Sequence, residues 1–303
     1  MSTQTAPALP QSLRVKRASM RGDRRRAMVW SYVFLCIFVC FTLTPPLYML
    51  ITSLKTNAEI SAAISPWWIF DPTLGNYIEL LTSPTYLTFF RNSAIVSILV
   101  VIITMAISVP AAFALSRMKF WGSATLATGV FLTYLIPETL LFIPLFKMFV
   151  QFNELTGIEL LNHWYVLVLL YPTLTVPFCT WIMIGYFASI PKELDEAALI
   201  DGASYTQILM KVFIPVALPG IIAATIFAFT VSWAQFLYPL AFISSADQLV
   251  LPVGIITTLI KGDVFTWGQI MTGALLGAAP PLIIYAFLMD YYIAGLTAGA
   301  TKG

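Results

Sequence analysis

Four of the fourteen acidic side chains lie within residues 189–219, between two long uncharged segments. Pro191 suits the first turn of a helix, where its missing N–H costs no hydrogen bond. Glu193, Asp195 and Glu196 would then lie near the positive end of the helix dipole, which stabilises carboxylates. A polar element of this kind can dock a partner protein, and it can equally be a solvated connection between membrane spans.

The same stretch contains the start and stop residues of two helices. Gly202 is expected to end the first helix, because glycine readily adopts the left-handed conformation common at helix C-termini. Ser204 and Gln207 have the spacing of a capping box, which would start a second helix running to about Phe213. The sequence therefore predicts a helix, a hinge and a second helix.

Side chains suited to catalysis or metal binding are few elsewhere. His163 is the only histidine and no cysteine pair surrounds it, so the ligand spacings of common metal sites are missing from the sequence. Cys36 and Cys40 share one face of a predicted membrane helix, where packing is their expected role. The sequence also has no Gly-x-x-x-x-Gly-Lys-Ser/Thr segment, which a phosphate-binding P-loop requires. We expect no catalytic residues, metal or cofactor in this chain.

The composition indicates a membrane protein. Apolar residues make up 59% of the chain, charged residues only 10%, and the mean hydropathy is +0.87. A soluble core could not enclose so much apolar surface, so lipid must solvate much of it. We predict an all-α, polytopic membrane protein with six transmembrane helices.

Uncharged stretches place these spans along the chain. The expected spans are residues 27–54, 92–116, 120–144 and 164–190, a fifth of about 20 to 24 residues after Pro219, and 264–289. External loops are expected at 55–91, 151–162 and 244–263. The predicted divisions are a flexible basic tail (1–26), a six-helix membrane domain (27–295) with a cytoplasmic hairpin at about 189–215, and a C-terminal tail (296–303).

Lysine and arginine divide unevenly between the two predicted sides of the membrane. Twelve lie in the segments assigned to the cytoplasm, seven of them in the N-terminal tail, and four lie in the external segments. This bias agrees with the positive-inside rule. It predicts that both termini and the hairpin are cytoplasmic.

Glu138 is an acidic residue expected within the third span. A carboxylate in hydrocarbon is unfavourable unless it faces protein or water, so one interpretation places Glu138 on a solute pathway. Counting from Ser123 at 1.5 Å per residue places it about 22 Å along the helix, near the outer interface. Water could reach the carboxylate there, and the sequence favours this second interpretation.

The small side chains of Ala197 and Ala198 would let another protein surface approach closely. With Glu196 before them and Gly202 four residues after them, they resemble the EAA loop of ABC importer permeases. Nearly the whole chain is similar to the maltose-transporter type of permease in carbohydrate ABC importers. The similar segments are 142–145 (Phe-Ile-Pro-Leu), 212–215 (Val-Phe-Ile-Pro), Trp233 with Phe236, and the ending 295–303. One departure lies at Ala234 and Gln235, where the family usually carries Asn and an acid.

The resemblance implies several partners and a cellular location. It implies a second, similar permease, two ATPase subunits that bind ATP and Mg²⁺, an extracytoplasmic solute-binding protein and the lipid of a bacterial or archaeal cytoplasmic (inner) membrane. Nucleic acid is not an expected partner. The implied ATPase-coupling residues are Glu196, Ala197, Ala198, Asp201 and Gly202, and the implied contacts of the C-terminal tail are Thr297, Gly299, Lys302 and Gly303.

Two function classes follow from these features. The first is a permease subunit of an ATP-driven, binding-protein-dependent sugar importer, which forms half of the translocation pathway. The alternative is a secondary, ion-coupled transporter of a small polar solute. That alternative needs an ionisable group within the membrane, for which Glu138 is the available candidate.

Overall fold

The computed structural model describes residues 11–62, 67–118, 120–261 and 264–300, and these are almost entirely helical. The long helices are α1 (Gln11–Ser53), α4 (Pro84–Arg117), α5 (Ser123–Tyr134), α6 (Glu138–Thr156), α8 (Pro172–Ser189), α12 (Leu218–Ala234) and α15 (Trp267–Ala300). The short helices are α2 (Asn57–Ile60), α3 (Gly75–Thr82), α7 (Tyr165–Leu170), α9 (Glu193–Ile200), α10 (Tyr205–Ile208), α11 (Ile214–Val216), α13 (Leu237–Phe242) and α14 (Leu251–Leu259). The remaining elements are a π-helical turn η1 (Leu209–Phe213) and a 3-10 turn η2 (Ala246–Gln248). Two two-residue strands, β1 (Ile260–Lys261) and β2 (Val264–Phe265), pair antiparallel. The all-α prediction is confirmed.

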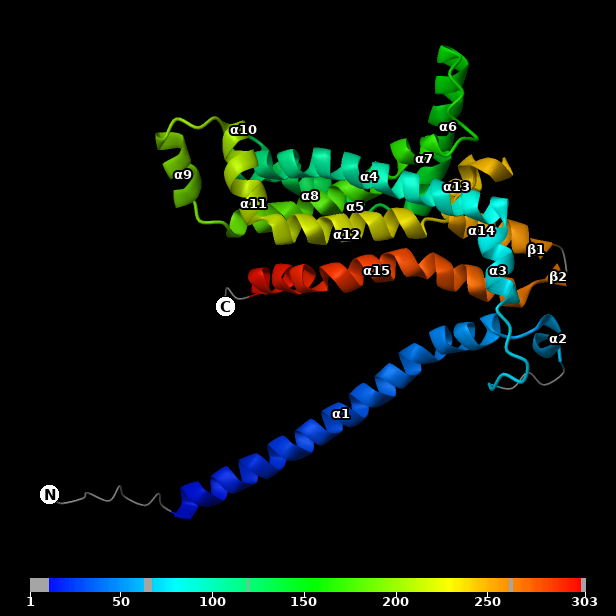
Figure 1. The fold of residues 1–303 in the computed structure, drawn as a ribbon. Helices are drawn as coiled ribbons and strands as arrows, with labels where there is room; N and C mark the ends of the chain where they lie inside the picture. The colour runs from blue at the N-terminus through cyan, green and yellow to red at the C-terminus, as the bar shows by residue number, and fades with distance from the viewer. Residues whose placement is uncertain (1–10, 63–66, 119, 262–263, 301–303) are drawn as a thin grey trace.

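Helices α4, α8, α12 and α15 form the central bundle (Figure 1). Helix α12 packs against the other three, and Gly220 makes its contact with α8 possible. A Cβ atom at Gly220 would lie 2.3 Å from the ring of Tyr186, so a larger residue there would force the two helices apart. One buried apolar cluster surrounds Phe89 and Leu170, and a second surrounds Phe113 close to α9.

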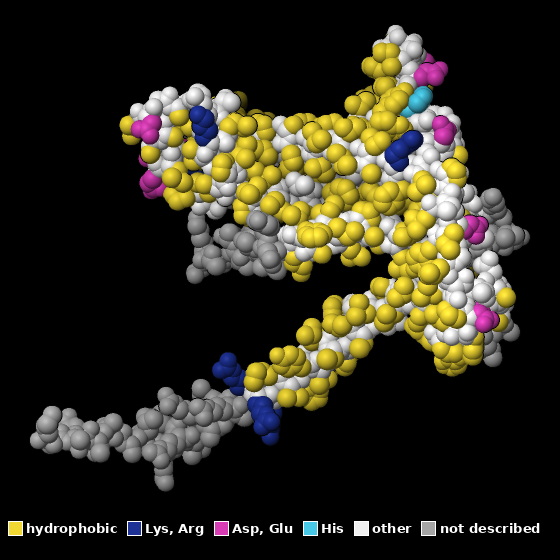
Figure 2. Space-filling view, in the orientation of Figure 1, with side chains coloured by type: hydrophobic (Ala, Val, Ile, Leu, Met, Phe, Trp, Pro, Cys, Tyr) yellow, Lys and Arg dark blue, Asp and Glu magenta, His cyan; other side chains and the backbone are white. Residues whose placement is uncertain are grey.

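The surface has the distribution of charge that a membrane protein requires. Apolar side chains cover the middle of the bundle and most of the visible length of α1, whereas charged groups gather near the ends (Figure 2). Four described helices are long and apolar enough to cross a membrane, and two bent helix pairs raise the number to six if each pair is one span. The prediction of six spans agrees with the upper number.

The third expected span is broken where the sequence analysis had one continuous helix. Helix α5 ends at Tyr134, and α6 leaves it at an angle of 95°. Pro137 cannot donate a backbone hydrogen bond and favours an extended residue before it, which explains the break. The expected loop at 151–162 is also wrong in its first half, because α6 continues to Thr156.

Three further boundaries differ from the sequence-based prediction. The basic tail is helical from Gln11, so it is not the flexible segment expected over its whole length. The expected external loop at 244–263 contains the apolar helix α14, whose Leu251 and Val253 are buried. The last span begins at Trp267, after the β1–β2 turn, and its helix continues to Ala300. Long apolar stretches locate membrane helices well, but they do not show where a polar segment continues the same helix.

Candidate functional site

The hairpin at α9 and α10 has the backbone that its sequence predicts. Gly202 has φ +77°, and the Ala203 and Gly202 amides donate to the carbonyls of Ala198 (3.0 Å) and Leu199 (3.1 Å). These two bonds form a Schellman motif, which closes α9. The capping box is also present, because the Ser204 hydroxyl accepts from the Gln207 amide and the Gln207 side chain accepts from the Ser204 amide. The predicted helix, hinge and helix are confirmed.

Helix α9 carries apolar side chains that no other part of the described chain covers. Leu194 and Leu199 are 42% and 44% exposed, and Ile200 is 86% exposed. Of the two alanines, Ala197 is exposed, whereas Ala198 packs against the buried cluster around Phe113. Helix α9 therefore has one small residue facing its own bundle and an apolar outer surface without a partner. The predicted coupling residues Glu196, Asp201 and Gly202 are exposed on the same element.

Arg117, at the end of α4, joins this hairpin to the bundle. Its guanidinium donates to the carbonyls of Phe187 and Ile190 at the end of α8, and it forms an ion pair with Asp195 of α9 at 3.4 Å. It also lies 4.9 Å from the ring centre of Phe213. A cation beside the C-terminal carbonyls of a helix is favourable, and the planar guanidinium can reach several acceptors at once.

Sequence reasoning assigned Arg117 only to a cytoplasmic turn. Its hydrogen-bond acceptors lie 70 to 78 residues further along the chain, so local spacing gives no indication of them. The available sign was a basic residue at the very end of a span, on the same side as an acidic helix. In the structure, Arg117 is the last residue of α4, and its side chain contacts three other elements: the end of α8, α9 and the π-helical turn η1.

Phenylalanine rings fill the space beneath Arg117. Phe113 of α4, Phe187 of α8 and Phe213 of η1 contact one another edge to face, with ring centres 5.0 to 6.2 Å apart. Such aromatic contacts are directional and add to the gain from burial. A displacement of α9 and η1 must therefore move the ends of α4 and α8, or break these contacts.

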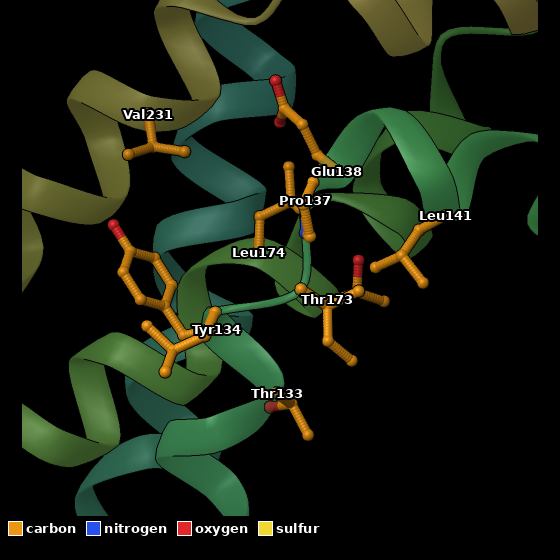
Figure 3. A pocket seen from close by; sticks show the side chains of 10 residues that line it. Thr133, Tyr134, Pro137, Glu138, Leu141, Thr173, Leu174 and Val231 are labelled. Carbon is orange, nitrogen blue, oxygen red and sulfur yellow. The ribbon is translucent and has the colours of Figure 1, made fainter.

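Glu138 lies at a second candidate site, far from the hairpin along the bundle. It begins α6, directly after the break in the third span, and its carboxylate accepts a 2.7 Å hydrogen bond from the Gln235 side chain. It lines a pocket of about 420 Å³, and Figure 3 shows Tyr134, Leu174 and Val231 around the same space. A pocket of this size lies within the range of small-molecule sites. The remaining labelled wall residues are Thr133, Pro137, Leu141 and Thr173.

Gln235 was noticed in the sequence only as a departure from a family pattern. Its hydrogen bond to Glu138 spans 97 residues, which single-sequence reasoning cannot infer. The pairing gives the Glu138 carboxylate a polar partner inside the chain. Whether Glu138 serves a solute pathway or the outer interface stays a prediction.

The predicted tail contacts fall at the end of α15. Thr297 and Gly299 are within the helical backbone, and Lys302 and Gly303 lie outside the described residues. The end of α15 lies at the same end of the molecule as α9 and α10, as does the beginning of α1 (Figure 1). That the two termini and the hairpin share the cytoplasmic side of the membrane stays a prediction.

A helical bundle with broken apolar spans and charged groups near its ends is typical of a multi-pass membrane protein. Residues 104–297 match the family described as "binding-protein-dependent transport system inner membrane component", and the chain belongs to this family.

Named relatives agree with this assignment. The chain is 36% identical over 262 residues to the sulfoquinovosyl glycerol transport system permease protein SmoH of Agrobacterium fabrum. The aligned region covers 86% of this chain and 89% of the relative. The chain is 31% identical to the trehalose/maltose transport system permease protein MalG of Thermococcus litoralis, with 92% and 98% covered. A chain from the crystal structure of a bacterial ABC transporter for alginate import has a TM-score of 0.76 and 21% identity, with 95% and 100% covered. That structure shows the same fold.

Proposed function

We propose that this chain is the permease subunit of an ATP-driven, binding-protein-dependent sugar importer. The names of its relatives support this, because they include transport permeases for trehalose and maltose, arabinooligosaccharides and diacetylchitobiose. These sugars differ from one another, so the names support a class of solute and no single sugar. The chain would form half of the translocation pathway, beside a second, similar permease.

The exposed apolar surface of α9 is the observation that carries the coupling proposal. A helix in water with several exposed leucine and isoleucine side chains marks a protein contact site. Glu196, Ala197, Asp201 and Gly202 are on or beside this surface. The partner would be one of two ATPase subunits, which would bind ATP and Mg²⁺, since the sequence contains no P-loop.

Arg117 would transmit the movement of the ATPase to the membrane spans. Closure of the ATPase pair on ATP would pull α9, and α9 is attached to α4 and α8 through Asp195 and Arg117. The bundle would then change from an inward-open to an outward-open arrangement, as a two-state element that a partner biases. A solute-binding protein would deliver the sugar from outside.

Membrane orientation follows from the same proposal. The chain would lie in a bacterial or archaeal inner membrane with the hairpin and both termini in the cytoplasm, in agreement with the excess of basic residues there. A single cysteine at Ser204 should resist a membrane-impermeant thiol reagent in intact cells, and one at Thr73 should react. Labelling of Ser204 from outside would exclude contact between the hairpin and a cytoplasmic ATPase.

The decisive experiment distinguishes ATP-driven from ion-driven import. The chain would be purified with its associated subunits, reconstituted in liposomes with the binding protein, and supplied with radiolabelled sugar. Uptake should require ATP, stop with orthovanadate and continue when proton and sodium gradients are dissipated. Uptake driven by an ion gradient without ATP would favour the secondary transporter instead.

A further inference from the structure

Two interruptions of the membrane helices lie beside the pocket. The third span breaks between Tyr134 and Glu138, and α12 ends at Ala234 before α13. Irregular backbone at membrane depth is stable only where it is buried in protein or lines a water-filled cavity. Discontinuous helices of this kind form the solute sites of many transporters. The pocket therefore lies beside breaks of the kind that line solute sites.

The polar groups near this convergence are incompletely satisfied. The hydroxyl groups of Tyr171 and Tyr238 are buried and have no hydrogen-bond partner among the described residues. Both side chains are fully buried, and both lie within electrostatic range of Glu138. A buried hydroxyl without a partner is costly. Neither tyrosine lines the pocket, so it is Glu138, and not these hydroxyls, that a solute in the pocket can reach.

Glu138 gives the pocket an uncompensated negative charge. Among the described residues it accepts a hydrogen bond from the neutral Gln235 side chain, and neither ion pair found there includes Glu138. A carboxylate accepts several hydrogen bonds, so Glu138 can still bind the hydroxyl groups of a sugar or an ammonium group. An acidic solute would meet like charge in a site partly shielded from water, where repulsion is strong.

We propose that this pocket is a sugar-binding half-site and that Glu138 selects against acidic sugars, in favour of neutral or amino sugars. This inference rests on the proposed import function and adds a solute class to it. Thr133 and Thr173 offer further hydroxyl groups on the wall, and Tyr134 offers an aromatic ring on which a sugar face can pack. The second permease would close the open side.

The charge of the pocket can be measured without knowledge of the natural solute. In the complete complex, Cys36, Cys40 and Cys179 would be replaced by serine, and Thr173→Cys would then place one thiol on the pocket wall. Its reaction rates with a cationic trimethylammonium and an anionic sulfonate methanethiosulfonate reagent give a charge-preference ratio. Leu141→Cys on another part of the wall provides a second reporter if Thr173→Cys fails to assemble.

Glu138→Gln should lower the cation-to-anion ratio about tenfold, because it removes the negative charge and keeps a similar shape. Glu159→Gln is the matched control, since Glu159 is an exposed acid that does not line the pocket. That control should leave the ratio unchanged. An unchanged ratio in Glu138→Gln would overturn charge selection, and a reporter thiol that no reagent reaches would overturn the pocket as a solute site.

Solute class is tested by protection of the same thiol. Trehalose and glucosamine should slow its modification, whereas glucuronate at the same concentration should not. In Glu138→Gln, glucuronate should also protect. Protection by none of the three, or by glucuronate in the unchanged pocket, would contradict the proposal. Either result would leave ATP-driven uptake intact, so it would be distinct from failure of the proposed import function.

Discussion

The hairpin and the pocket lie at opposite ends of the bundle and are stabilised in different ways. The hairpin is shaped by bonds between near neighbours in sequence, such as the Ala203 amide to the Ala198 carbonyl and the reciprocal bonds of Ser204 and Gln207. The pocket is formed where distant chain breaks meet, and its polar pair joins residues 97 positions apart. Only the hairpin could therefore be derived in detail from the sequence.

This difference assigns different tasks to the two ends. The hairpin combines a locally determined shape with an exposed apolar surface, which suits an element that is pulled by a partner without deforming. The pocket lies beside broken helices and carries the Glu138 carboxylate, which suits an element that must change its contacts during a transport cycle. Variants at each end should consequently fail in different measurements.

Arg117 should give the largest effect, because it joins the hairpin to two membrane helices. Its side chain is 5% exposed and that of Asp195 is 19% exposed, so losing this pair should cost less than the ~3 to 5 kcal/mol of a fully buried one. Arg117→Gln should lower solute transported per ATP hydrolysed more than about tenfold, since α9 would lose its link to the ends of α4 and α8. Coupled uptake and hydrolysis in proteoliposomes measure this ratio.

Two further variants separate assembly from coupling at Arg117. Arg117→Lys keeps the charge and loses the planar fork, so it should assemble normally and recover only part of the transport ratio. Asp195→Asn removes the ion pair while Arg117 keeps its carbonyl acceptors, so it should have a smaller effect than Arg117→Gln. Normal coupling in Arg117→Gln would show that the movement of α9 reaches the spans by another route.

Gly202 should give the second largest effect. A β-branched residue in the left-handed conformation costs about 1 to 2 kcal/mol, which is small for a chain with six spans. Gly202→Val should therefore insert at near-normal abundance, yet tilt α9 so that the ATPase is lost or hydrolyses ATP without moving solute. We expect a fall of about tenfold in the transport ratio or no retained ATPase.

Gly157 is a matched control for this prediction. It also follows a helix C-terminus, with φ +69°, and like Gly202 it has no neighbouring atom within 4 Å of an added Cβ. Gly157→Val thus imposes the same backbone strain at the end of α6, away from the hairpin. It should keep its ATPase and its transport ratio. Equal defects in the two variants would mean that backbone strain, and not the position of α9, causes the loss.

The parts of the fold that the sequence predicted are those determined by local chemistry. Apolar length located the spans, Gly202 ended α9, and Ser204 with Gln207 started the next helix. Each of these features depends on residues within a few positions of one another. The continuation of α6 to Thr156 was missed because its polar residues were interpreted as a loop, and α14 was missed because its burial depends on distant segments.

The candidate sites divide in the same way. The exposed position of Glu196, Ala197 and Gly202 on a polar hairpin could be read from composition and spacing. The role of Arg117 could not, since its carbonyl and carboxylate partners come from other parts of the chain. For Glu138, the estimated distance of about 22 Å assumed one continuous helix, which the break after Tyr134 contradicts, and its partner Gln235 and the pocket depend on how distant spans meet.

Replacing Gln235 should have a moderate effect on sugar uptake and none on the amount of bound ATPase. Gln235→Leu removes the hydrogen bond to Glu138 and leaves the carboxylate without that partner. A rise of about three- to tenfold in the sugar concentration for half-maximal uptake is expected, with an unchanged amount of bound ATPase. Gln235→Asn shortens the side chain but keeps the amide, so it should be milder. Loss of bound ATPase in Gln235→Leu would show that the two ends are not separable.

The C-terminal tail should give the smallest effect. The end of α15 lies on the hairpin side of the bundle, and the tail is proposed to add contact area for the ATPase beside that of α9 (Figure 1). Deleting Thr297–Gly303 should leave insertion intact and lower ATP-dependent uptake by about twofold, because the contacts of α9 with the ATPase would remain. The reduction should increase as the ATPase is diluted, since a weaker interface dissociates first. A matched control replaces Thr297 alone by serine, which keeps the length of the tail. Unchanged uptake at every dilution would reduce the tail to a simple terminus, and α9 alone would then carry the contact with the ATPase.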